Sequence, residues 1–74
     1  MEVQVRLFAG FREGRFNRRA VEVPDGSCLG DLFEQLDLPK GRATIRMVNG
    51  RHAELDCPLA ADDVVAIFPA IAGG

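Results

Sequence analysis

The sequence predicts a single α+β domain, in which a mixed sheet of four to five strands carries one main helix packed on one face. Two stretches near the start alternate apolar and polar residues, as half-buried strands do. One central stretch has its apolar residues at helical spacing, and the final stretch is apolar on both faces. Because 74 residues support only one core, we expect a single domain over residues 1–74, with a flexible tail at 70–74.

The first two strands are predicted at residues 2–9 and 17–23. In the first, three aliphatic side chains face one way, while Phe8 falls on the opposite, mostly polar side. In the second, Val21 and Val23 point inward and alternate with charged residues. The two stretches follow one another across a glycine-containing loop, so we expect them to pair as a hairpin.

The main helix is predicted to follow the turn signature at residues 24–26, with Ser27 as its N-cap. Pro39 disfavours helical geometry in the residue before it, so the helix should end near Asp37. Gly30 costs a helix roughly 1 kcal/mol relative to alanine, which indicates a close backbone contact with the sheet. The apolar stripe of this helix comprises Leu29, Leu32, Phe33 and Leu36.

A second hairpin is predicted around Asn49 and Gly50, the dipeptide most typical of a tight turn between strands. Residues 44–49 form its first strand, and residues 51–55 form a short, polar return strand at an edge of the sheet. Residues 57–61 are interpreted as a single helical turn.

The last strand, residues 64–68, follows a turn at Asp62 and Asp63 and is apolar on both faces, which is typical of a central strand. One helix covers only one face of a sheet, so the other face of this strand should lie open beside the first strand. An exposed apolar patch on a small domain usually marks a partner. The predicted partner interface comprises Phe8, Ala66, Phe68 and Pro69.

The chain ends in two glycines, which leave the terminal carboxylate unguarded by any side chain. A backbone without Cβ atoms can enter a narrow cleft that excludes other residues. We therefore interpret the domain as a handle that presents the carboxylate of Gly74 to other enzymes. The residues that give access to it are Ile71, Ala72 and Gly73.

Composition excludes several classes of function. The net charge of −2 argues against a nucleic-acid partner. No apolar run approaches the ~20 residues of a membrane span, and no signal-peptide core is found. We therefore expect a cytoplasmic protein without a membrane partner, with reduced thiols at Cys28 and Cys57. A basic cluster is interpreted as a solvated loop or a protein-docking edge: Arg12, Arg15, Arg18 and Arg19.

Catalytic and metal sites are not expected. Cys28 stands in a Gly-Ser-Cys-Leu-Gly stretch that superficially fits a nucleophile elbow, but the chain is too short for a hydrolase fold. The single histidine, His52, lies in a hairpin arm without partners for a metal. An acidic group before the last strand is either a docking feature or a plain polar turn, and it comprises Asp56, Asp62 and Asp63.

Four stretches resemble the ubiquitin-like β-grasp sulfur carriers, above all the small subunit of molybdopterin synthase (MoaD) and its thiamine counterpart (ThiS). They are LFAGFRE at 7–13, GSCLGDLFEQL at 26–36, MVNGR at 47–51 and DVVAIFPAIAGG at 63–74. The family often has a second proline at position 70 and a glycine within residues 61–63. Aspartate tolerates the left-handed conformation, so the turn there should survive.

The resemblance implies that an E1-like enzyme uses ATP and Mg²⁺ to adenylate Gly74, and that sulfur from a persulfide then leaves a thiocarboxylate. The carrier itself would bind no cofactor and would not be an enzyme. Its second partner would be a large catalytic subunit of molybdopterin synthase type or of thiazole synthase type. The ending fits molybdopterin synthesis best, with sulfur transfer for thiamine thiazole or for cysteine as alternatives. Two other classes stay open, a ubiquitin-like protein modifier and a non-catalytic interaction module.

Overall fold

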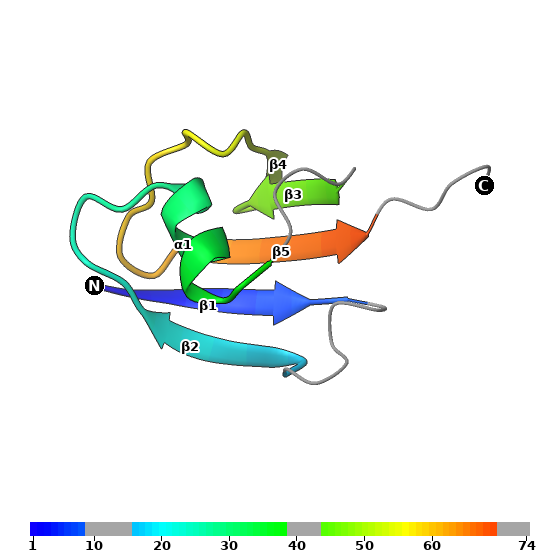
Figure 1. Cartoon of the computed structure of the whole chain (residues 1–74), viewed down its shortest axis with the longest axis horizontal. Helices are drawn as coiled ribbons and strands as arrows, with labels where there is room; N and C mark the ends of the chain where they lie inside the picture. Colours follow the sequence, from blue (N-terminus) through cyan, green and yellow to red (C-terminus); the bar gives the residue numbers. More distant parts are fainter. Residues whose placement is uncertain (9–15, 39–43, 70–74) are drawn as a thin grey trace.

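The computed structural model describes residues 1–8, 16–38 and 44–69, which form one helix and one five-stranded sheet (Figure 1). The strand order is β2-β1-β5-β3-β4; β1 and β5 are parallel, and the other neighbours are antiparallel. The predicted mixed sheet, with the last strand in its centre, is confirmed. The elements are β1 (Glu2–Leu7), β2 (Arg18–Glu22), α1 (Leu29–Gln35), β3 (Thr44–Val48), β4 (Arg51–His52) and β5 (Val64–Pro69).

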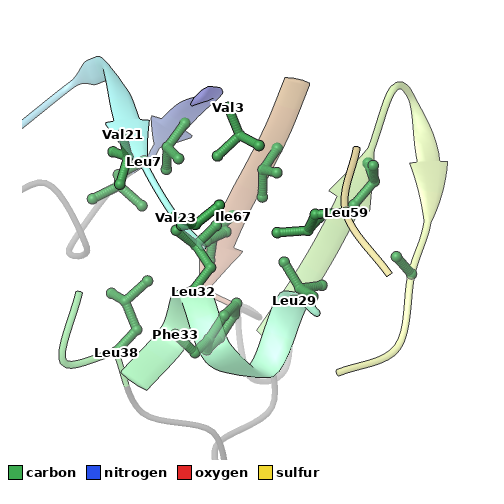
Figure 2. Close-up of a cluster of buried hydrophobic side chains, with 14 residues drawn as sticks. Val3, Leu7, Val21, Val23, Leu29, Leu32, Phe33, Leu38, Leu59 and Ile67 are labelled. Atoms are coloured by element: carbon green, nitrogen blue, oxygen red, sulfur yellow. The ribbon is translucent and has the colours of Figure 1, made fainter. Parts of the chain in front are cut away.

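The hydrophobic core lies between α1 and one face of the sheet (Figure 2). β1 and β5 both send every second side chain into this core, as predicted for β1 as a half-buried strand. Full burial of each aliphatic or phenylalanine side chain contributes about 1.5–3 kcal/mol. Among the described helices, none is long and apolar enough to cross a membrane. The largest fully buried side chains are Phe33, Leu7, Leu29, Leu32, Ile67, Val3, Val5 and Val65.

The start of α1 differs from the prediction. Cys28, not Ser27, is the N-cap, with an extended backbone at φ −103° and ψ 174°. The Ser27 hydroxyl donates to the carbonyl of Pro24 at 2.7 Å, so the preceding turn uses it. The Cys28 backbone N–H in turn donates to Asp31 Oδ2 at 2.9 Å, and this carboxylate also suits the positive end of the helix.

Gly30 makes the close backbone contact that its presence predicts, but not with the sheet. Its N–H donates to the carbonyl of Leu55 at 2.7 Å, and a Cβ on Gly30 would lie 3.2 Å from that oxygen. The chain that approaches α1 is therefore the connection between β4 and β5.

The predicted helical turn at residues 57–61 is absent. Pro58 instead forms a β-bridge with Cys28, flanked by hydrogen bonds from Leu59 N–H to Ser27 O and from Leu29 N–H to Cys57 O, each 2.9 Å long. Pairing with the start of α1 satisfies a helix-terminal N–H, which a separate helical turn at 57–61 would leave without this partner.

Tight turns join β3 to β4 and lead into β5. Asn49 (φ 52°) and Gly50 (φ 81°) have positive φ, as the predicted hairpin turn requires, and Asp62 (φ 67°) is left-handed as expected. The Asn49 side chain also ties β3 to β5: its Nδ2 donates to Asp63 Oδ1, and its Oδ1 accepts from Val64 N–H, both at 2.9 Å.

Candidate functional site

β5 carries the chain to its C-terminal end from the middle of the sheet (Figure 1). Its last residue, Pro69, pairs with Thr44 of β3 on one side. On the other side, Phe8 N–H donates to Ile67 O at 3.1 Å. The strand is therefore held by β1 as far as Ile67 and by β3 as far as Pro69. The tail lies outside the described residues, so Gly74 as reacting group, with Ile71, Ala72 and Gly73 giving access to it, stays a prediction.

Phe8 and Phe68 lie side by side on the open sheet face, near the ends of β1 and β5. Their rings are stacked, with centroids 4.2 Å apart and planes inclined by 12°. Both side chains are half-buried: they cover each other, and α1, the helix among the described residues, packs on the opposite face. Ala66 lies two residues earlier on the same face of β5. The structure thus brings together three of the four residues predicted to contact a partner.

Pro69, the fourth residue, lies differently. Directly paired residues share a face, and Pro69 pairs with Thr44 one step beyond the Phe68–Ile45 pair. Pro69 therefore points to the same side of the sheet as the buried Ile67. Its position suits the end of a strand more than the surface around Phe68.

The strand register adds residues to this face that sequence reasoning missed. Ile45 pairs with Phe68, and Met47 pairs with Ala66. Ile45 and Val64 are the large hydrophobic side chains left most exposed, at 43% and 40%. The alternation of residues 44–48 shows that Ile45 and Met47 share a side, but only the pairing shows which side. The surface we call the open-face patch comprises Phe8, Ile45, Met47, Val64, Ala66 and Phe68.

Arginines border the open-face patch on the β1–β2 side. The Arg6 guanidinium lies 5.5 Å from the centroid of the Phe8 ring. Two open hollows, of ≈ 290 and ≈ 420 Å³, each have Arg6 and Arg18 in their walls. Arg19 points to the other side of β2, where its guanidinium lies 4.4 Å from the Phe16 ring centroid. The predicted basic cluster is therefore divided between two faces, and its remaining members lie outside the described residues.

Asp63, in the acidic group before β5, has a structural role. The Asp63 carboxylate accepts from Asn49 Nδ2 at 2.9 Å and from Ala60 N–H at 2.8 Å, which holds the turn closed. This favours the polar-turn interpretation over a docking feature. Cys28 and Cys57 are both free thiols, and His52 Nδ1 lies 3.9 Å from Glu54 Oε1 on an exposed edge.

Comparison with known proteins adds sequence and structural relatives. The model of the ThiS family matches residues 5–74. A putative molybdopterin converting factor subunit 1 from Pyrococcus furiosus is 29% identical, covers 96% of this chain and 99% of its own, and has a TM-score of 0.81. No curated protein matches the chain.

Two further solved structures are 24% identical to this chain, a likeness that shows the fold alone. Small archaeal modifier protein 1 of Haloferax volcanii has a TM-score of 0.81, over 95% of this chain and 98% of that one. Subunit 1 in the complex of subunits 1 and 2 of molybdopterin-converting factor from Helicobacter pylori has a TM-score of 0.69, over all of both chains. These neighbours share the β-grasp fold that the sequence predicted.

Proposed function

We propose, from the premise that the chain belongs to the ThiS family, that it is a sulfur carrier whose Gly74 carboxylate becomes a thiocarboxylate. One observation carries the proposal. The family match runs through to Gly74, and the tail follows directly from a central strand that is paired with β1 as far as Ile67 and with β3 as far as Pro69. A paired central strand followed by a chain end of two glycines suits the delivery of a terminal carboxylate into a partner's cleft.

The chemistry follows from the weakness of a carboxylate as an electrophile. An E1-like partner, using ATP and Mg²⁺, would convert the Gly74 carboxylate into an acyl adenylate, which has AMP as a good leaving group. The outer sulfur of a persulfide donor would then displace AMP and form an acyl disulfide. A second thiol, supplied by the donor or its enzyme, would cleave the S–S bond, releasing the thiocarboxylate and becoming part of a disulfide. The resulting thiocarboxylate sulfur is a soft, anionic nucleophile at neutral pH, suited to attack on an activated carbon. In this cycle the chain supplies the carried group, and its partners supply the catalysis.

The receiving partner is proposed to be a large catalytic subunit of molybdopterin synthase type. The Pyrococcus furiosus relative carries the name of a putative molybdopterin converting factor subunit 1, and the Helicobacter pylori neighbour was solved in complex with subunit 2. The open-face patch offers such a subunit an apolar surface beside the strand that leads into the tail. Thiazole synthesis and cysteine synthesis are the alternative destinations of the sulfur.

A protein modifier is the second candidate, favoured by the fold shared with small archaeal modifier protein 1. Both functions need the same activated Gly74 carboxyl group. They differ in the nucleophile that attacks it, which is sulfur for a carrier and a lysine amine of another protein for a modifier. The products therefore separate the two functions.

The test is the intact mass of the tagged protein purified from its own cells. A carrier shows a species heavier by the difference between sulfur and oxygen, and a modifier shows larger conjugates. Because Cys28 and Cys57 are free thiols that alkylating reagents also label, the matched variant is Cys28→Ser/Cys57→Ser, in which any single alkylation reports the thiocarboxylate. Wild-type protein that carries neither sulfur nor conjugates in cells that make its partners would refute the proposal.

A further inference from the structure

The edge strand β2 and its neighbour β1 carry a regular pattern of charges on the open face of the sheet. Glu2 lies directly opposite Glu22, and Arg6 lies directly opposite Arg18. All four side chains are exposed. They point away from α1, because they alternate with the buried Val3 and its neighbours. We call these four residues the charge strip.

Both pairs of the charge strip place like charges opposite each other, which destabilises a sheet. Exchanging Arg18 with Glu22 would turn both pairs into favourable opposite-charge pairs without altering composition. Local partners offset the repulsion only partly. The Met1 amine lies 3.7 Å from Glu22 Oε2, and the hydrogen bond that this amine donates to Asp25 Oδ1 raises its pKa.

The arginine pair has no acidic partner within the described residues. There, no carboxylate lies within ion-pair distance of Arg6 or Arg18, and Arg6 has only its contact with the ring of Phe8. The charge strip opposes folding, although an exchange of two of its residues would favour folding. This indicates that its charges interact with another molecule.

We propose that the charge strip fixes the orientation of the protein that docks on the open-face patch. The partner surface is apolar at its centre, presents a carboxylate to Arg6 and Arg18, and presents a basic side chain to Glu2 and Glu22. This rests on the proposed function, since it describes the partner of that same face. The ≈ 420 Å³ hollow bounded in part by Arg6, Arg18 and Val64 gives the partner's carboxylate room beside the patch. Arginine binds carboxylates through two parallel hydrogen bonds.

The charge strip runs parallel to the strand that leads into the tail. Arg6 pairs with Ala66, near the end of β5, whereas Gln4 pairs with Val64, where β5 begins. The glutamates therefore lie at the far end, about 13 Å away for four residues of strand. A partner docked in reverse would place like charges together at both ends. Such repulsion selects one orientation, and in that orientation the end of β5 lies at the acidic end of the partner.

A polyanion is the competing ligand for the arginine pair, and the structure disfavours it. The two glutamates lie on the same strip, and the whole chain has a net charge of −2. A phosphate chain that follows the strip would meet repulsion within about two Debye lengths of the arginines. A partner with both charges is the better complement.

The test is the exchange variant Arg18→Glu/Glu22→Arg, measured alone and with the purified large subunit that co-purifies with the wild-type chain. Alone, the variant should be more stable, with Tm raised on the order of 5 °C, because both pairs become favourable. With the partner, its Kd should rise at least about tenfold, and its Kd should depend less on salt between about 0.05 and 0.5 M. The matched control is Arg51→Glu/Asp56→Arg, which exchanges two exposed charges outside the strip and should bind as the wild type does.

The outcomes separate this inference from the proposed function. An exchange variant with unchanged or lower Tm would refute the premise that the strip opposes folding, whatever it binds. If wild type is thiocarboxylated and the variant binds the large subunit as tightly as wild type does, only the proposed role of the charge strip in orienting the partner is refuted. Wild-type chain that is never thiocarboxylated and retains no large subunit would refute both.

Discussion

Replacement of Phe68 by alanine is expected to weaken both folding and docking, and the stacked pair allows the two effects to be separated. Full burial of a phenylalanine is worth up to about 3 kcal/mol, so the half-buried ring of Phe68 contributes roughly half of that. Its stack on Phe8, at 4.2 Å and 12°, adds about 0.5–1.5 kcal/mol. The free energy of unfolding should therefore fall by about 2–3 kcal/mol, which a domain with roughly 4–11 kcal/mol of stability tolerates.

A double-mutant cycle in urea isolates the stacking contribution. Phe68→Ala should cost less when Phe8 is already alanine, because the stack is then already lost. The expected coupling energy is about 0.5–1.5 kcal/mol. A coupling energy near zero would show that the two rings are adjacent without stabilising each other.

Docking is measured on the same variants as Kd for the large subunit. A central anchor of an interface contributes at least about 2 kcal/mol, so Phe68→Ala should raise Kd roughly thirtyfold. Phe16→Ala is the matched control, since Phe16 is also a half-buried phenylalanine but packs against the core and under Arg19. It should lose stability and keep its affinity. Equal Kd values for the two variants would contradict the assignment of the open-face patch as the docking surface.

Three further predictions concern the turn into β5, the helix and the tail. Asn49→Ala should lower the free energy of unfolding by about 1–2 kcal/mol in urea, because the 2.9 Å bond to Asp63 is lost and alanine tolerates positive φ poorly. Gly30→Ala should lower Tm by a few degrees, since the ~1 kcal/mol gain in helix propensity is outweighed by a Cβ placed 3.2 Å from the Leu55 carbonyl oxygen; a higher Tm would contradict this. Deletion of Gly74 should leave Tm unchanged and remove every thiocarboxylate species from the mass spectrum.

The order and type of the elements could be predicted because local patterns determine them. Val3, Val5 and Leu7 alternate strictly, and their burial follows from that alternation. The central place of β5 could be predicted because a strand that is apolar on both faces is typical of the middle of a sheet. The Asn49-Gly50 turn followed from the rarity of residues that accept positive φ.

Long-range pairing explains what the sequence could not show. The face on which Ile45 and Met47 lie depends on the register between β3 and β5, and a shift of one residue would reverse it. The N-cap was misplaced because the turn at Pro24 uses the Ser27 hydroxyl, a competition that residue preference alone does not reveal. The opposition of Arg6 and Arg18 likewise requires the register of β1 with β2.

Selectivity among sulfur-receiving partners must reside on the open face if the chain acts as we propose. The reacting end consists of glycines, which offer a partner nothing to distinguish beyond their small size. β5 contributes to both faces of the sheet. Its Val65 and Ile67 pack in the core, while its Ala66 and Phe68 belong to the open-face patch. Apolar surfaces of this kind bind without much regard to direction, whereas opposite charges at the two ends of a strand fix both partner and orientation. The pathway that uses this carrier should therefore be identified by the charges of its partner.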